Sequence, residues 1–289
     1  MVLADLFFCW LFRLSTCQGQ ERREYSVLIV CLGDSVTQGL GVSKYGRSYG
    51  NLLQSKLQSL YAQSVQLMNL AGSAMQVHES RMKYEKKLME MQPEIIIFAH
   101  GITESVVREQ KKHLRFLPKR WRKPGWMDPR PYFSRRKPKV WLEKLESSLR
   151  WRVKVILIKT LGGRPWMSVD EFKQHTTDFI LNVLGHNQKT KIILLTPGDI
   201  EERYFPGSPA SMQKYRDALR DIYENSKSTN RVFMCDSSTK LHRWDDYFED
   251  RFHPNEGGHN KIAEALMDTI VKYSLIDDER MHVMREVSG

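Results

Sequence analysis

The sequence has few cysteines, and their spacing and surroundings indicate neither a zinc site nor a need for disulfides. Only four occur in 289 residues, Cys9, Cys17, Cys31 and Cys235, and none has the short spacing of a zinc site. Cys31 and Cys235 stand in apolar, strand-like runs, where a free thiol packs as a small hydrophobic side chain. We therefore expect no metal site and no cofactor, and nothing in the sequence demands an oxidising compartment.

A long hydrophobic run near the amino terminus is also missing. The apolar stretch at residues 6–12 is too short to span a bilayer, and Asp5 precedes it instead of a basic segment. Residues 14–17 have only a faint likeness to a lipoprotein cleavage site. We therefore expect residues 1–23 to be an interfacial or disordered leader. The alternative is that the start of the protein was wrongly chosen and that these residues do not belong to it. We expect a cytoplasmic protein, with membrane association left open, in preference to an exported lipoprotein.

Length and composition fit one sizeable domain. The chain is 41% apolar and 27% charged, which is enough to bury a continuous core, and it contains no internal repeat. We assign this domain to residues 24–276, with a basic insertion at 107–140 and a tail at 277–289.

Apolar, β-rich runs alternate with amphipathic ones, which predicts βαβ units and a mostly parallel sheet. We predict five or six strands, beginning near Val27, Val65, Glu94, Val153, Lys191 and Arg231. Helical spacing predicts helices over 49–61, 170–184, 212–225 and 261–273. The run at 153–158 is ambiguous, because it could instead line the insertion.

Two short motifs at opposite ends of the domain suggest nucleophilic catalysis. Ser35 follows Gly33 and Asp34 at the end of the first apolar run, and Asp250 stands three residues before His253. A serine hydroxyl becomes a useful nucleophile when an imidazole takes its proton and a carboxylate orients that imidazole. The spacing therefore predicts Ser35 as nucleophile, His253 as base and Asp250 as its partner, with Asp246 as a second candidate for the acid.

Both motifs resemble blocks of the SGNH, or GDSL-type, hydrolase family. The first block is Gly33-Asp34-Ser35-Val36-Thr37-Gln38-Gly39, and the last runs from Asp250 through His253 to His259. The resemblance covers about residues 25 to 275 and implies a flavodoxin-like three-layer α/β/α sandwich. It also implies ester hydrolysis or acyl transfer, often on carbohydrates.

The middle blocks, which the resemblance assigns to the oxyanion hole, depart from the family pattern. In the second block the donor glycine of the family falls on Ala74, while Gly72 is the nearest actual glycine, and either backbone N–H could serve beside that of Ser35. In the third block, Thr103 replaces the asparagine donor of the family. Thr103 could donate with a shorter reach, or it could cap the following helix beside Glu104.

The insertion is the most individual part of the chain. Thirteen Lys or Arg residues fall between Arg108 and Lys139, against only Glu109 and Asp128. Three interpretations are open for residues 108–139: a solvated basic loop, a nucleic-acid site, or binding of an anionic glycan or membrane surface. We favour the last and disfavour nucleic acid, because no recognition fold is evident.

The segment after Gly101, with residues 167–172 and 204–207, also resembles SGNH proteins associated with bacterial surface-polysaccharide synthesis. The leading hypothesis is a serine esterase that removes an O-acyl group, such as acetyl, from a carbohydrate. The alternatives are a sugar O-acyltransferase, which would use the same triad, and a non-catalytic glycan or anionic-surface binding protein.

Overall fold

The computed structural model describes residues 27–42, 46–61, 64–122, 125, 127–128 and 136–276. The leader, the tail, Cys9 and Cys17 lie outside these residues, as does part of the basic insertion. Cys31 and Cys235 are buried free thiols, as the apolar runs predict.

A five-stranded parallel sheet forms the centre of the molecule. Its strands are β1 (Val27–Gly33), β2 (Val65–Asn69), β3 (Ile95–Ala99), β6 (Lys191–Leu195) and β7 (Val232–Cys235), in the order β2-β1-β3-β6-β7. Parallel strands covered on both faces carry continuous apolar runs, which is why the sequence identifies them well. This order matches the flavodoxin-like prediction and places a topological switch point between β1 and β3, where α/β folds form their ligand crevice.

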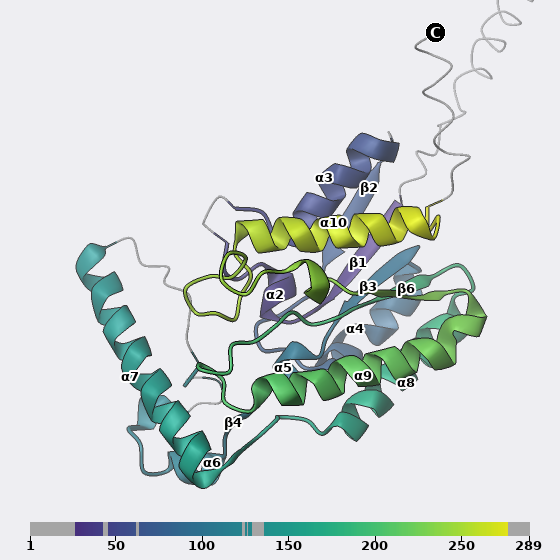
Figure 1. The fold of residues 1–289 in the computed structure, drawn as a ribbon. Helices are drawn as coiled ribbons and strands as arrows, with labels where there is room; N and C mark the ends of the chain where they lie inside the picture. Colours follow the sequence, from purple (N-terminus) through teal and green to yellow (C-terminus); the bar gives the residue numbers. More distant parts are fainter. Residues whose placement is uncertain are drawn as a thin grey trace, which may run out of the picture.

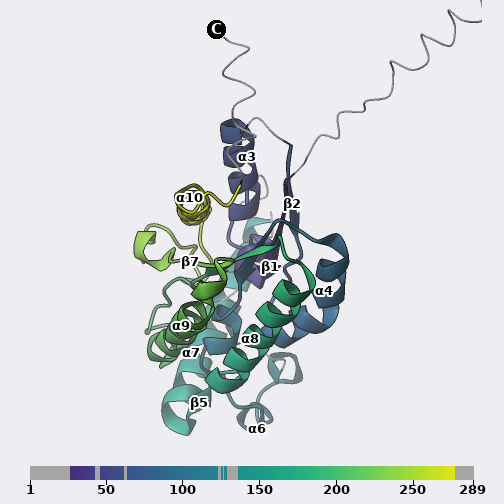
Figure 2. The same ribbon diagram turned by 90° about the vertical axis from the view of Figure 1, so that its right-hand side faces the viewer.

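Helices cover both faces of the sheet (Figures 1 and 2). One layer contains α3 (Tyr49–Tyr61) and α10 (Glu256–Lys272), and the other contains α4 (Val77–Met91), α8 (Val169–His186) and α9 (Ser208–Ser226). Side chains alternate between the two layers along each strand: Ile29 and Cys31 face α3 and α10, whereas Val30 and Leu32 face the opposite layer. The three-layer α/β/α prediction is confirmed.

The connection from β3 to β6 carries the insertion. It contains α5 (Ile102–Ser105), β4 (Arg108–Glu109), α6 (Lys111–Leu114), the 3₁₀ turn η1 (Lys119–Arg122), α7 (Lys137–Leu161) and β5 (Gly163–Arg164). β4 and β5 pair antiparallel and close the segment between them. The predicted range 107–140 therefore covers the part before α7 and only the first residues of that helix.

The predicted strand at 153–158 is wrong, because these residues lie inside α7. Val153, Val155, Ile156 and Ile158 are β-branched, which favours a strand locally. The tertiary structure overrides this preference: burial recurs at Ser147, Arg150, Lys154 and Ile158, the three-to-four-residue spacing of one helix face. In the described part of the chain, no helix combines the length and apolarity needed to cross a membrane.

A buried charge cluster ties the insertion to the rest of the domain. Asp128 accepts hydrogen bonds from Lys154 of α7 and from Arg108 of β4, the latter at 3.1 Å. The Lys154 side chain is fully buried. Burial by itself raises the pKa of Asp128, but the charges of Lys154 and Arg108 outweigh it and hold that pKa below its ordinary value. The Asp128 carboxylate thus pairs with two cationic side chains where water has been excluded.

Candidate active site

Ser35 stands in the tight turn between β1 and the short helix α2 (Ser35–Gln38). The Asp34 carboxylate caps this helix by accepting the Val36 N–H at 3.0 Å. A side chain at Gly33 would clash, since a Cβ there would lie 2.2 Å from Thr37 Oγ1 and 2.8 Å from the Ala99 carbonyl. The turn therefore holds Ser35 at the carboxyl edge of β1, beside the switch point.

The structure brings Ser35, His253 and Asp250 into one hydrogen-bonded line. Ser35 Oγ lies 2.9 Å from His253 Nε2, and His253 Nδ1 lies 2.6 Å from Asp250 Oδ2. The other Asp250 oxygen accepts the N–H groups of Phe252 and His253, each at 3.0 Å. Only 6% of Ser35 and of His253 and 1% of Asp250 is exposed, so the geometry is held by the protein interior.

Asp246, the second candidate for the acid, lies elsewhere. Its carboxylate accepts the His242 N–H at 2.6 Å and the Lys261 ammonium at 2.7 Å. It thereby closes the loop before α10. Of the two candidates, Asp250 is the one whose carboxylate contacts the His253 ring.

Gly41 is a site residue that the sequence analysis missed. Its φ of +100° is in the region that favours glycine, and a Cβ there would lie 2.4 Å from the Pro254 carbonyl and 2.8 Å from His253 Cβ. The absence of a side chain lets the loop after α2 pack directly against His253. A glycine two residues after Gly39 was the only available signal in the sequence.

Gly72 and Ala74 differ in whether their N–H groups are free. The Gly72 N–H donates to the Gly33 carbonyl at 3.2 Å, which extends the pairing of the loop with β1. The Ala74 backbone has a φ of +59°, unusual for a residue with a side chain. Among the described residues, no hydrogen bond engages its N–H. Of the two predicted backbone donors, Ala74 is the one available to a ligand.

Thr103 has neither of the two geometries considered from the sequence. Its hydroxyl donates to Asp34 Oδ2 at 2.8 Å, and a hydroxyl has only one proton to give, so Thr103 cannot donate to an oxyanion while this bond persists. It is not the helix cap either, since Gly101 holds that position. Glu104 does serve the helix start, because its carboxylate accepts the Gly101 N–H at 2.9 Å.

Two buried carboxyl groups, those of Asp34 and Glu104, lie close to each other beside Ser35. Burial raises the pKa of Asp34, although the hydrogen bond from Thr103 opposes the shift. Burial, followed by the nearby Asp34 charge, raises the pKa of Glu104 to about 7. Thr103 thus contributes to this site by stabilising the charged form of Asp34.

We expect Thr103→Val to lower the free energy of unfolding by about 1–3 kcal/mol, because it removes a hydrogen bond from a buried carboxylate. Thr103→Ser keeps the hydroxyl and is the matched control. Urea unfolding of the three proteins measures the effect. An unchanged stability together with a fall in kcat of about 10²–10³-fold would instead assign Thr103 to the oxyanion hole.

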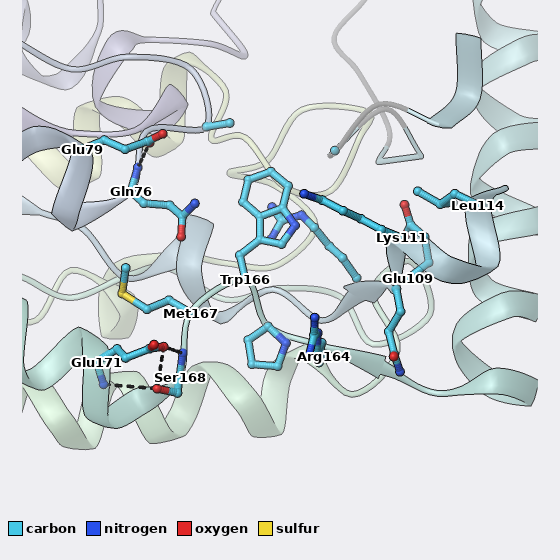
Figure 3. Close-up of a pocket in the computed structure, with 15 residues that line it drawn as sticks. Gln76, Glu79, Glu109, Lys111, Leu114, Arg164, Trp166, Met167, Ser168 and Glu171 are labelled. Carbon is cyan, nitrogen blue, oxygen red and sulfur yellow. Dashed lines mark hydrogen bonds between the residues drawn. The ribbon is translucent and has the colours of Figure 1, made fainter. Parts of the chain in front are cut away.

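A cavity of about 850 Å³ lies beside Ala74. Figure 3 shows the Trp166 indole standing in it, with Gln76 on one side and the Lys111 side chain extending toward it from the other. Gln76 precedes α4, Lys111 begins α6 and Trp166 follows β5. The sequence analysis singled out none of the three. Their spacing carries no motif, so only the fold could bring them together.

The walls of this cavity are partly charged. Trp166 stacks on the Arg108 guanidinium, whose carbon lies 3.8 Å from the ring centroid. Glu109 is 8% exposed, its Oε2 has no hydrogen-bond partner within the described structure, and burial raises its pKa. In the residues that the structure describes, no group of three or more His, Cys, Asp or Glu side chains is arranged to hold a metal ion.

Comparison with solved structures identifies the class of fold. The chain is similar to LAE5, an alpha/beta hydrolase from a Lake Arreo metagenome (17% identity, 87% of this chain and 96% of that one, TM-score 0.53). It is also similar to Axe2, an acetylxylan esterase of Geobacillus stearothermophilus (17%, 84% and 93%, 0.51), and to a Parabacteroides merdae protein described as a GDSL-like lipase (14%, 86% and 96%, 0.53). No model of a protein family and no curated protein sequence matches the chain.

At these identities the likeness establishes the fold, which is the one that GDSL-like lipases and acetylxylan esterases share. The fold that the SGNH resemblance implies is therefore confirmed.

Proposed function

We propose that this protein is an SGNH-type carboxylic ester hydrolase that removes small O-acyl groups from a carbohydrate. The observation that carries the proposal is the hydrogen-bonded line from Ser35 through His253 to Asp250. Two solved Axe2 variants support it, since they are described as catalytic mutants and replace one serine and one aspartate.

The distances suit a two-step mechanism. Asp250 accepts a hydrogen bond from His253 Nδ1–H, which leaves Nε2 unprotonated and directed at the Ser35 hydroxyl. In the first step Ser35 Oγ attacks the ester carbonyl while His253 takes its proton. The imidazolium then protonates the departing sugar oxygen, and an acyl-enzyme remains. In the second step His253 removes a proton from water, and hydrolysis releases the acid and restores Ser35.

The developing oxyanion needs donors that are already in place. We assign this role to the backbone N–H of Ser35, at the start of α2, and to the N–H of Ala74, which has no acceptor among the described residues. With the Gly72 N–H and the Thr103 hydroxyl engaged elsewhere, the site has one donor fewer than the family pattern implies. A lost donor typically costs about 2.7–4 kcal/mol of transition-state stabilisation, so we expect slow turnover of unactivated esters.

The cavity beside Ala74 supports a carbohydrate as the alcohol part of the ester. Ser35, His253 and Asp250 do not line this cavity, and Ala74, whose N–H we assign to the oxyanion, is the residue that links it to the triad. An indole face suits stacking on a sugar ring, while the Gln76 amide and the Lys111 ammonium can donate to hydroxyl groups. The same cavity could hold a second sugar in place of water, which would make the protein an O-acyltransferase. We therefore propose an acylated sugar as the substrate. The assay below distinguishes water from a second sugar as the acceptor of the acyl group.

The test is hydrolysis of p-nitrophenyl acetate and of an acetylated xylo-oligosaccharide, with intact-mass detection of an acyl group on Ser35. We expect turnover of both esters, and release of the acyl group to water without an added acceptor. Release that requires an added sugar would show acyl transfer. A folded protein that turns over neither ester and acquires no acyl group would favour the non-catalytic binding protein.

Trp166→Ala tests the carbohydrate assignment separately. We expect it to raise KM for the acetylated oligosaccharide about tenfold, which corresponds to about 1.4 kcal/mol, because the apolar face of the sugar ring would lose its contact with the indole. The kinetics for p-nitrophenyl acetate, which has no sugar, are the internal control for folding. Equal effects on the two substrates would contradict a sugar-binding role for Trp166.

A further inference from the structure

The long helix α7 leaves an apolar face uncovered. Its buried residues, Ser147, Arg150, Lys154 and Ile158, lie along one face, and the helix packs against β4 and β5. Because successive residues are about 100° apart around the helix axis, a second row of residues lies on the opposite face of the helix, within about 60° of arc. This row, the α7 stripe, consists of Leu142, Leu145, Leu149 and Ile156, each between 50% and 60% exposed.

Figure 1 shows α7 at one end of the molecule, outside the three layers. Trp141 is 62% exposed near the start of the same helix. Four large aliphatic side chains in one row, next to an exposed indole, leave apolar surface open to solvent along this helix. Such a surface on a protein marks an interaction site.

The charge around the α7 stripe is positive. Of the seven Lys or Arg residues of the helix, Arg150 and Lys154 are buried on the other face, which leaves five exposed cations against Glu143 and Glu146. Glu146 is already engaged by Arg120 and by the Trp121 indole N–H. Arg152 and Lys159, both exposed, fall along one border of the stripe. The insertion that precedes the helix adds the largest excess of basic residues in the chain.

Three kinds of partner would cover the α7 stripe, and the positive charge around the stripe distinguishes between them. A second copy of this chain, joined along the stripe, would set one strongly basic helix against another, which is unfavourable. A nucleic acid or other polyanion would match the charge but would leave the four aliphatic side chains in water. An anionic bilayer satisfies both, because it offers headgroups to the basic residues and an acyl boundary to the stripe.

We propose that α7 docks this protein on an anionic lipid bilayer, with the α7 stripe in the acyl boundary and Arg152 and Lys159 at the headgroups. The helix would lie in the interface and not cross it, which agrees with its high charge. β5, against which α7 packs, leads directly into Trp166 of the cavity. Docking would hold the protein at the membrane surface, with α7 between the bilayer and the β4–β5 side that lines the cavity. If the proposed function holds, an acylated, lipid-linked sugar would then be a substrate within reach.

The experiment is co-sedimentation of the full chain with phosphatidylcholine vesicles, with and without phosphatidylglycerol. We expect binding to the anionic vesicles, weakened by salt. The double variant Leu145→Glu/Leu149→Glu should reduce the partition coefficient about tenfold or more, since each change places a charge in the acyl boundary. The matched control is Met82→Glu/Leu181→Glu, which makes the same charge change at exposed apolar positions of α4 and α8 and should bind like the parent.

Three results would overturn the proposal. The first is that the stripe variant binds the vesicles as well as the parent does. The second is that light scattering shows a dimer for the parent and the control but a monomer for the stripe variant. The third is that the parent binds DNA but not anionic vesicles. Turnover of p-nitrophenyl acetate should be equal in the parent, the stripe variant and the control, which reports folding. Vesicle binding and ester turnover are separate readouts, so either proposal can fail without the other.

Discussion

Replacing Ser35 by alanine is expected to lower kcat for p-nitrophenyl acetate by about 10³–10⁶-fold, because the attacking oxygen is lost while the rest of the site stays in place. His253→Ala should be comparable, since the groups of a triad act as one unit and their effects do not add. The acyl-enzyme should disappear from the intact-mass spectrum of both variants. Ser35→Ala removes a single oxygen, so its denaturation midpoint should stay close to that of the parent. His253→Ala leaves the buried Asp250 Oδ2 without its partner and should lower the midpoint, so circular dichroism of this variant checks that it is folded at the assay temperature.

Asp250→Asn isolates the orienting role of the carboxylate. The amide keeps the size of the side chain but presents the wrong partner to His253 Nδ1, and the analogous change in a serine protease costs about 10⁴ in kcat. Asp245→Asn is the matched control, because Asp245 is an exposed acid of the same loop. Turnover that survives in Ser35→Ala, or that falls equally in the two Asp variants, would exclude the triad mechanism.

The second large effect concerns stability. Asp128→Ala is expected to reduce the free energy of unfolding by about 3–5 kcal/mol, because it leaves the fully buried Lys154 charge without its partner. The double variant Asp128→Ala/Lys154→Met should recover part of this loss, since it removes one of the two buried cations together with the carboxylate, while Arg108 keeps its hydrogen bonds to the Thr103 and Val106 carbonyls. Urea unfolding of the single and double variants measures both effects.

Asp221→Ala provides the comparison for Asp128, since its salt bridge with Lys173 is 40–60% exposed and should contribute no more than about 1 kcal/mol. The pKa of Asp128 is lowered in the folded state, so its contribution is complete above the unfolded pKa of about 4 and is lost as the pH falls through the lower folded value. Equal losses for Asp128→Ala and Asp221→Ala would show that the cluster does not hold the insertion.

The central sheet and the chemical core of the site could be predicted from local patterns. Buried parallel strands consist of continuous apolar runs, and five of the six predicted strands are present in the structure. The three-residue spacing of Asp250 and His253 is itself a local geometry, because the Asp250 carboxylate also accepts the two N–H groups within that turn. Ser35 could be placed at the sheet edge because its turn directly follows β1.

The remaining features depend on partners that are distant in the sequence. Whether the run at 153–158 forms a strand or a helix was decided by the packing of α7, and whether Thr103 faces a ligand was decided by Asp34, which lies 69 residues earlier. Likewise, the Gly72 N–H donates to the Gly33 carbonyl, whereas in the described part of the chain the Ala74 N–H has no acceptor.

The sequence by itself determined the α/β class, the strand runs and the identity of Ser35, His253 and Asp250 as candidates, because hydrophobic periodicity and short motifs are properties of neighbouring residues. Only the tertiary structure decided which donors remain free, that Gln76, Lys111 and Trp166 share a cavity, and that α7 exposes an apolar row. Hydrogen-bond availability, cavity shape and exposure are properties of residues from separate segments, and they are defined once the chain has packed.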